Sequence, residues 1–386
     1  ENKMEFRDLK KQYQVLKPRI DEAMLAVAAK CNFIGGNQVK ELEASLAEYV
    51  GVKHCVTCGN GTDALSLMMM AWGVGVGDAV FVPDFTFFAT GEIVSFAGAT
   101  PIFVDVNADT FNLDAESLEK GIQLVLAEGK LKPKVVIPVD LFGLPANYDA
   151  INVVAKKYNL LVLEDGAQGF GGMIGEKRAC SFGDAATTSF FPAKPLGCYG
   201  DGGAVFTNDD EISELLESYK VHGKGSFKYD NLRVGINSRL DTIQAAILQV
   251  KFQAFKDYEL GDVNKVAKLY TEMLQGVVKT PIIPQNFYSS WAQYTLILDS
   301  KDQRDSLGKF LKANDIPSMV YYPKPMHLQQ AFAALEQQIP CPITEKLCNT
   351  VLSLPMHPYM EKKDVEIICG CVKLFMKNGE KYNVQK

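Results

Sequence analysis

The chain has 386 residues, 47% of them hydrophobic and 22% charged, and its formal net charge is −6. This length and apolar content suit an ordinary globular protein with two domains and a sizeable core. No basic run suggests a nucleic-acid surface, and no apolar stretch is long enough to cross a bilayer, so we expect neither a nucleic-acid nor a membrane partner.

The N-terminal stretch and the cysteines give an expectation for the cellular compartment of the protein. The stretch 1–14 is polar, so we expect no signal peptide. The nine cysteines form no regular disulfide framework, and Cys55 and Cys58 lack a second pair at zinc spacing. We therefore expect these cysteines to pack in the core, expect no metal site, and predict a cytoplasmic location with reduced thiols.

Strand-like and helix-like segments alternate along the first half of the chain. Helices are predicted at 18–29 and 38–50, separated by a turn at 33–36. Short apolar runs then predict seven strands, at 54–57, 79–82, 100–105, 134–139, 160–164, 185–190 and 204–207. This alternation favours an α/β fold with one mainly parallel sheet, helices on both faces and right-handed crossovers.

The second half has a different pattern. Helices are predicted at 210–220 and 238–273, and the second is long enough to link a large domain to a smaller one. Beyond about residue 276 an α+β mixture follows, with a strand at 292–298 and helices at 303–314 and 362–378. We predict a large domain with an N-terminal arm at 1–250, and a linking helix with a smaller α+β domain at 251–386.

Lys194 has surroundings suited to chemistry. It follows a β-prone run that Pro192 ends, and it stands beside Pro195 before a glycine-rich turn. An amine in such an apolar setting is poorly hydrated, which lowers its pKa and leaves it able to attack a carbonyl. The alternative is an ordinary loop lysine.

A second group of polar residues follows an unbroken apolar run at 160–163. Such a run is typical of a central parallel strand, and open α/β sheets bind ligands at the carboxyl ends of their strands. Asp165 could there face a cationic ring nitrogen, and Gln168 could reach a substituent of the same ring.

The third element is the segment CGNGTDAL at 58–65, where small residues open a helix. The N–H groups at a helix N-terminus bind anions, and Ser189 adds a hydroxyl donor. A phosphate cradle, an acidic strand end and a desolvated lysine together describe a site for pyridoxal 5'-phosphate (PLP), with Lys194 as the Schiff-base lysine and Asp165 on the pyridinium nitrogen.

Several segments in order resemble one family, the DegT/StrS-type nucleotide-sugar aminotransferases, which have the aspartate-aminotransferase fold (PLP-dependent transferase fold type I). The matching segments are NGTDAL at 60, PDFTFFAT at 83, LEDGAQ at 163, SFFPAKPLGCYGDGGA at 189, VGINSRLDTIQAA at 234 and LSLPMHPY at 352. The resemblance covers nearly the whole chain and implies a PLP-dependent transaminase.

The resemblance also implies roles for individual residues. Phe87 would stack on the pyridine ring, Gln168 would contact the ring hydroxyl, and Lys194 would move the proton during transamination. The alternative for Phe87 is a core position. Cofactor binding would involve Thr62 and Asp63 through backbone N–H groups, with Phe87, Asp165, Gln168, Ser189, Lys194 and Asn237.

Further residues would serve the substrate. In the family the loop carrying Asn237 and Arg239 reaches the neighbouring subunit's site, which implies a homodimer with shared active sites. Arg239 suits a carboxylate, and a structural ion pair is its alternative. Tyr321 and Tyr322 would also be offered across the dimer, although many relatives have a histidine where this chain has Tyr321. His327 and His357 are interpreted as structural.

The expected reaction moves an amino group from L-glutamate, through a pyridoxamine phosphate form, to the ketone of a nucleotide-linked sugar. The segments most resemble the branch that aminates C3 of a UDP-linked 3-keto-N-acetylglucosaminuronate for bacterial surface polysaccharide such as the lipopolysaccharide O-antigen. Lys224, Lys228 and Arg233 could meet its diphosphate, or they could form a solvated loop face.

Four alternatives remain open at this point. A dTDP-linked 3- or 4-keto-6-deoxysugar is the alternative substrate. A PLP-dependent dehydratase of the same scaffold would lack the lysine that Lys194 supplies. A lyase or desulfurase would have a histidine in place of Phe87. A PLP-binding regulator would need a DNA-binding segment.

Overall fold

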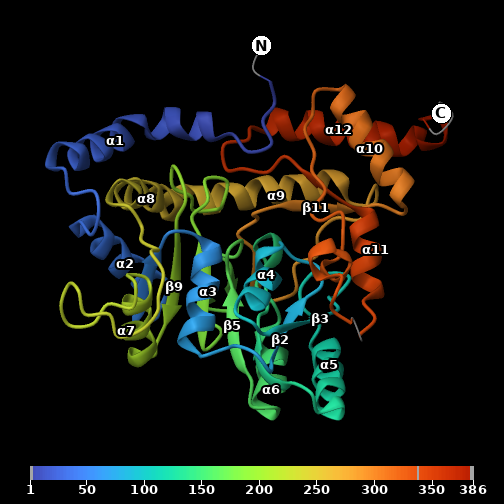
Figure 1. Ribbon diagram of the computed structural model, residues 1–386. Helices are drawn as coiled ribbons and strands as arrows, with labels where there is room; N and C mark the ends of the chain where they lie inside the picture. The colour runs from blue at the N-terminus through green and yellow to red at the C-terminus, as the bar shows by residue number, and fades with distance from the viewer. Residues whose placement is uncertain (1–2, 337–338, 383–386) are drawn as a thin grey trace.

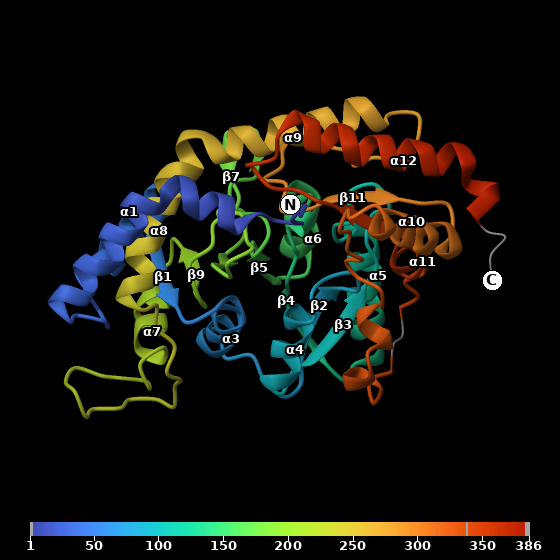
Figure 2. The same cartoon turned by 90° about the horizontal axis from the view of Figure 1, so that it is seen from above.

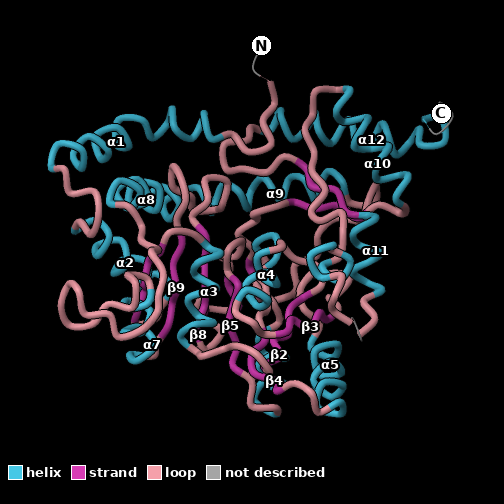
Figure 3. Tube along the Cα trace, in the orientation of Figure 1, coloured by secondary structure: helices cyan, strands magenta, loops and turns pink. Residues whose placement is uncertain are grey.

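The computed structural model describes residues 3–336 and 339–382, so residues 1–2, 337–338 and 383–386 of the two predicted domains lie outside the described residues. A sheet of seven strands runs through the centre of the molecule in the order β1-β9-β8-β5-β4-β2-β3 (Figures 1 and 3). Its strands are β1 His54–Cys58, β2 Asp78–Pro83, β3 Thr100–Val104, β4 Lys132–Val136, β5 Leu161–Asp165, β8 Ala185–Ser189 and β9 Gly203–Thr207.

All seven predicted strands are present in this sheet. β9 pairs antiparallel with β1 and β8, and the other pairs are parallel, as a mainly parallel sheet requires. Neighbouring strand residues point to opposite faces. Leu163 packs with helices α3 (Gly61–Ala71) and α4 (Ala89–Phe96), whereas Val162 packs with α5 (Ala115–Glu128) and α6 (Tyr148–Lys157). Helices therefore cover both faces, which confirms the α/β fold class.

The first helix, α1, spans Leu9–Lys30 and begins well before the predicted start at residue 18. The Asp8 side chain caps it by accepting a hydrogen bond from the Lys11 N–H at 2.8 Å, and Pro18 lies inside the helix. The prediction was wrong because it took Pro18 as the beginning of the helix. α2 (Asn37–Val50) and α7 (Asp210–Tyr219) lie close to the predicted bounds.

The long helix predicted at 238–273 consists of α8 (Thr242–Ala254), a π-helical turn (Phe255–Glu259) and α9 (Leu260–Leu274). α8 packs on the sheet through residues such as Leu248 and Phe252. α9 packs through Tyr270 and Leu274 into a separate hydrophobic cluster. This helical run therefore connects two cores, and it crosses the molecule above the sheet in Figure 1.

The second core contains a small antiparallel sheet of β11 (Tyr294–Ile297) and β12 (Val351–Leu354). α10 (Lys301–Ala313) and α12 (Lys362–Tyr382) pack on it, and α11 (Pro342–Thr350) leads into β12. The remaining short elements are β6 Met173–Ile174, β7 Lys177–Arg178, β10 Phe287–Tyr288 and the 3-10 turns Leu141–Gly143, Met326–Leu328 and Gln330–Phe332. Among the described residues, no helix combines the length and apolar character needed to span a bilayer.

Candidate active site

Asp165 is the last residue of β5, at the carboxyl end of the sheet. It is 4% exposed, and its carboxylate accepts hydrogen bonds from Thr90 Oγ1 at 2.9 Å and from the Ala167 N–H at 3.2 Å. Burial raises the pKa of Asp165, and those two donors and the nearby Lys194 amine oppose the rise. The site therefore holds a buried acid that two hydrogen bonds orient toward a cation.

Lys194 lies in the turn after β8, and its N–H donates to the Phe191 carbonyl at 2.9 Å. Burial of the amine lowers the pKa of Lys194, and the Asp165 carboxylate opposes that shift. The structure thus brings these two residues together from separate parts of the sequence. A lowered pKa leaves more of the amine neutral at a given pH, as a nucleophilic lysine requires.

The N-terminus of α3 reaches the same end of the sheet. The Asn60 side chain caps the helix by accepting a hydrogen bond from the backbone N–H of Asp63 at 2.7 Å. Because this N–H already has a partner, it is not available for the phosphate contact that we predicted for Asp63. The Asp63 carboxylate turns aside, as expected, and accepts from Ser238 Oγ at 2.6 Å. The N–H groups of Gly61 and Thr62 remain for an anion.

Ser189 adds a hydroxyl beside this helix start. A Cβ atom on Gly61 would lie 2.8 Å from Ser189 Cβ, and one on Gly203 would lie 2.4 Å from the Asn60 carbonyl oxygen. Only glycine permits these approaches, which bring β8, β9 and α3 close together. Ser189 Oγ accepts from the Phe191 N–H at 3.2 Å and keeps its own proton to donate.

Gln168 and Tyr322 form another wall of the site. Gln168 Oε1 accepts from the Phe142 N–H at 2.8 Å, and Nε2 donates to the Tyr322 hydroxyl at 3.0 Å. Phe87 lies in the loop between β2 and α4, is 55% exposed, and has its ring centroid 6.4 Å from that of Tyr322. The exposed ring excludes the alternative of a core position for Phe87.

Two of these contacts were not predicted. Tyr322 was expected to serve a neighbouring subunit, but its hydroxyl lies on Gln168 of the same chain. Thr90, which orients Asp165, was missed. Its signal in the sequence is a hydroxyl at the start of the helix after PDFTFF, four residues beyond Thr86, whose Oγ1 lies 3.0 Å from that of Thr90.

The predicted substrate residues Asn237, Arg239 and Lys228 are exposed in the single chain. Arg239 forms no ion pair with the described residues, so the structural alternative for it gains no support. The Lys228 ammonium lies 5.3 Å from the ring centroid of its neighbour Tyr229. In the single chain these residues belong to the loop between α7 and α8, which projects from the body of the molecule (Figures 1 and 2).

Both candidate histidines have structural contacts. The backbone N–H of His327 donates a hydrogen bond to Asp84 Oδ1 at 2.8 Å, and the ring Nδ1 of His327 lies 2.6 Å from Asp84 Oδ2. The Cys341 thiol lies in the same cluster, within 4.8 Å of these ligand atoms, but the Asp84–His327 separation is that of a hydrogen bond. His357 is 7% exposed and its Nδ1 accepts from the Tyr359 N–H at 3.2 Å.

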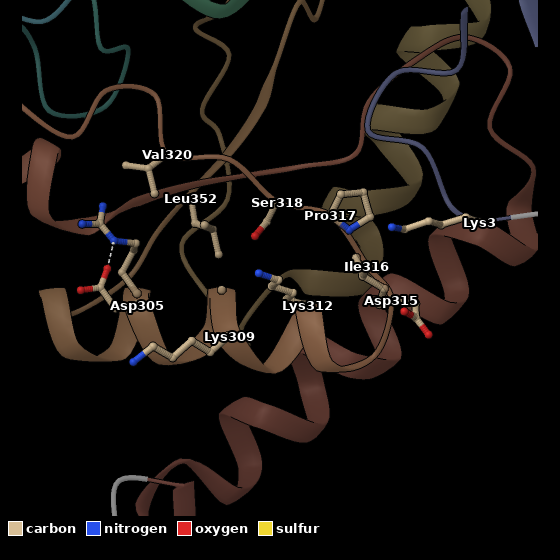
Figure 4. A pocket seen from close by; sticks show the side chains of 12 residues that line it. Lys3, Asp305, Lys309, Lys312, Asp315, Ile316, Pro317, Ser318, Val320 and Leu352 are labelled. Carbon is tan, nitrogen blue, oxygen red and sulfur yellow. Dashed lines mark hydrogen bonds and ion pairs between the residues drawn. The ribbon is translucent and has the colours of Figure 1, made fainter. Parts of the chain in front are cut away.

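A cavity of about 690 Å³ lies elsewhere, between α10 and the segment 316–320. Figure 4 shows Lys309 and Lys312 at its rim with Ser318 and Leu352 opposite. Arg304, which also lines it, already donates to the carbonyls of Cys348 and Val351 at 3.0 and 3.1 Å. None of the residues predicted for the active site lines this cavity, so it is a separate feature.

The residues at the sheet edge fit PLP on their own chemistry. Asp165 would bind the pyridine nitrogen, and the Lys194 amine would form a Schiff base with the aldehyde carbon of the cofactor. The N-terminus of α3, together with Ser189, would bind the phosphate. The bound cofactor would supply an electron sink. Fold and site together define a PLP-dependent transaminase of fold type I.

Comparison with known proteins specifies the class further. The chain belongs to the DegT/DnrJ/EryC1/StrS aminotransferase family, whose model matches residues 14–373. It is thus a PLP-dependent nucleotide-sugar aminotransferase, and the resemblance, the cofactor and the enzyme class expected from the sequence are confirmed. The dehydratase, lyase and regulator alternatives are set aside.

Three similar proteins illustrate the relationship. A UDP-2-acetamido-2-deoxy-3-oxo-D-glucuronate aminotransferase of Pseudomonas aeruginosa is 45% identical over 96% of this chain and 99% of its own. A UDP-N-acetyl-3-dehydro-alpha-D-glucosamine 3-aminotransferase of Acidithiobacillus ferrooxidans is 38% identical over 95% and 96%. The crystal structure of a DegT DnrJ EryC1 StrS aminotransferase from Brucella abortus superimposes with a TM-score of 0.94 at 46% identity, covering 97% of this chain and 99% of that one.

The burial of His357 predicts a loss of stability in acid. Burial, with Arg7 nearby, lowers the pKa of His357 to about 4, whereas the unfolded chain titrates near the ordinary value of about 6.5. Between these values the unfolded state binds a proton that the folded state does not, so stability falls as the pH falls. Urea unfolding at pH 7 and pH 4.5 should show a loss about 1–3 kcal/mol smaller for His357→Gln than for the wild type.

The exposed histidine gives a matched control for that measurement. His222→Asn removes a histidine that is exposed in the single chain, and it tests whether the smaller loss is specific to the buried His357. An equal loss in His357→Gln and the wild type would contradict the interpretation.

Proposed function

We propose that this enzyme transfers an amino group from L-glutamate to C3 of a UDP-linked 3-keto-N-acetylglucosaminuronate for surface polysaccharide such as O-antigen. The observation that carries the proposal is the 45% identity, over nearly the full length of both chains, to the Pseudomonas aeruginosa protein named for that substrate. The match covers 96% of this chain and 99% of that relative, so it extends over both halves of the chain.

The proposed division of labour follows from the contacts. Lys194 moves the proton at the substrate carbon, because its lowered pKa allows its amine to act as both acceptor and donor. Asp165, which Thr90 orients, would keep a proton on the pyridine nitrogen of the bound cofactor. Gln168 and Tyr322 would hold the cofactor ring from one edge, and the exposed Phe87 ring would cover its face.

The charge of the proposed substrate agrees with the exposed cations. A UDP-uronate carries a diphosphate and a carboxylate, and Arg239 offers two parallel donors to a carboxylate. Lys224 and Lys228 are exposed and can meet a diphosphate. Arg233 is less suited, because its Nη1 donates to Ser218 Oγ at 2.7 Å and its guanidinium lies 5.6 Å from the Tyr219 ring centroid.

We further propose a homodimer with shared active sites. The loop between α7 and α8 exposes large apolar side chains, which are Phe227, Tyr229, Leu232 and Val234 at 65, 81, 63 and 91%. Phe33 and Ile34 expose 44 and 47% beside it, where the Phe33 carbonyl accepts from the Thr242 N–H at 2.9 Å. A second copy would cover this surface and place Asn237 and Arg239 in the neighbouring site.

Two further predictions stay with this proposal. All nine cysteines are free thiols, which supports a reducing compartment such as the cytoplasm. The division into a large domain at 1–250 and a smaller one at 251–386 agrees with the change of core between α8 and α9, and it stays a prediction.

The role of Lys194 can be tested chemically. Borohydride reduction of the loaded wild type should fix the cofactor on the peptide that contains Lys194, as mass spectrometry detects. Lys194→Ala should lose that adduct and about 10²–10⁴-fold or more of the turnover, because the proton carrier is gone. Lys120→Ala changes an exposed lysine on α5 and should retain both. Turnover like that of the wild type in Lys194→Ala would contradict the assignment.

The shared sites can be tested by mixing inactive subunits. Each variant removes a different part of the shared site, with Lys194→Ala in one and Asn237→Ala/Arg239→Ala in the other. In a mixed dimer, one of the two sites therefore combines unaltered residues from both subunits. Random exchange should restore about a quarter of the wild-type activity, because half the dimers are mixed and half their sites are intact. Exchange is verified by co-purification of differently tagged subunits. No recovery after verified exchange would show that Asn237 and Arg239 act within their own chain.

The proposed substrate can be tested by letting keto-sugars compete for the enzyme, with glutamate as the common amino donor. The UDP-3-keto-N-acetylglucosaminuronate should exceed the matched UDP-3-keto-N-acetylglucosamine by about 10–100-fold in kcat/KM, since only the first carries the carboxylate. A dTDP-4-keto-6-deoxyglucose should be slower still. A faster reaction with the dTDP sugar would overturn the proposed substrate while the enzyme remains an aminotransferase.

A further inference from the structure

The segment before α1 makes a direct contact with the turn that carries Lys194. Arg7 Nη2 donates to the Lys194 carbonyl oxygen at 3.0 Å, across 187 positions of the sequence. Within the described residues this is the only hydrogen bond of the Arg7 side chain, and no carboxylate forms an ion pair with it. In Figure 2 the segment before α1 accordingly runs toward the middle of the molecule.

Arg7 is half-buried where it makes this bond. Burial lowers the pKa of its guanidinium, and the Glu259 carboxylate opposes the shift from nearby. Glu259 is 3% exposed, lies in the π-helical turn, and accepts from Gln12 Nε2 at 2.6 Å and from the Tyr359 hydroxyl at 3.1 Å. The carboxylate is thus engaged by other donors, so the guanidinium remains directed at the Lys194 carbonyl.

The neighbouring residue of the same segment contacts the opposite side of the site. The Phe6 carbonyl accepts from the Met356 N–H at 3.1 Å, and the Phe6 ring lies edge-on to Tyr321, with the centroids 6.3 Å apart. Tyr321 precedes Tyr322, whose hydroxyl accepts from Gln168. Residues 6 and 7 therefore connect the turn that carries Lys194 with the segment that carries Tyr321 and Tyr322.

We propose that Arg7 is a positioning residue for Lys194. Its charge-assisted hydrogen bond fixes the carbonyl of Lys194 and thereby the direction in which that residue's side chain leaves the backbone. This inference rests on the proposed role of Lys194 as the cofactor's attachment site. A charged donor to a carbonyl forms a stronger hydrogen bond than a neutral donor, and solvent competes less at this part-buried contact than at an exposed one.

The predicted consequence is a slower attachment of the cofactor to Lys194. Apoenzyme is mixed with PLP, samples are reduced with borohydride over time, and mass spectrometry measures the modified Lys194 peptide. Arg7→Met keeps the length and apolar packing of the side chain but removes the donor, and the rate should fall about tenfold. Arg7→Lys retains one charged donor and should recover part of the rate.

Lys11→Ala provides the matched control. Lys11 lies in the first turn of α1, close to Arg7 in the sequence, and forms an exposed ion pair with Glu361, so its variant should attach the cofactor at the wild-type rate. The thermal unfolding of each apoenzyme is measured beside the kinetics, which are run well below the unfolding temperature.

The possible outcomes distinguish the role of Arg7 from the role of Lys194. An Arg7→Met rate equal to the wild type, with or without a lower unfolding temperature, would overturn positioning by Arg7 and leave the role of Lys194 intact. An equal slowing in Lys11→Ala, or no recovery in Arg7→Lys when Arg7→Met is slow, would also overturn it. Absence of any adduct on Lys194 of the wild type would remove the proposed function and this inference together.

Discussion

Three carboxyl groups are buried side by side where β4 and β5 end, and their mutual repulsion limits which of them can carry charge. Asp140 and Glu164 are both fully buried, and the Asp140 N–H donates to the Asp165 carbonyl at 3.0 Å. Burial raises the pKa of Asp140 to about 7 and raises that of Glu164 well above its ordinary value. Close carboxyls in a low dielectric hold a proton between them, so this pair remains partly protonated near neutral pH.

Asp165 differs from that pair because a cation faces it. Asp140 accepts a hydrogen bond from the Tyr148 hydroxyl, and Glu164 accepts one from the Phe182 N–H at 3.1 Å. Of the three carboxylates, only Asp165 has the Lys194 amine opposite. A positively charged ring nitrogen in the same place would further favour the ionised form of Asp165. The proton that Asp140 and Glu164 share reduces the repulsion they exert on Asp165, and this favours the ionised form of the carboxylate that Thr90 orients.

Much of this arrangement could be predicted from the sequence because it depends on local pattern. The run at 160–163 identifies β5, and the residues that follow a parallel strand must lie at the ligand-binding edge of the sheet. Lys194, Ser189 and the helix start near Asn60 follow by the same logic from the ends of β8 and β1. The alternation of apolar runs also predicted every strand of the main sheet.

The contacts that set the properties of those residues could not be predicted in the same way. Arg7 on Lys194, Tyr322 on Gln168 and Thr90 on Asp165 join residues 187, 154 and 75 positions apart. No periodicity encodes such a pair, because each partner comes from a segment whose direction is decided by packing elsewhere. The early start of α1 illustrates this: the Asp8 cap carries the helix nine residues beyond Pro18 toward the N-terminus, and that start directs Arg7 to the Lys194 turn. A lysine recognised by its motif thus acquires its orientation from a part of the chain whose own sequence gives no sign of chemistry.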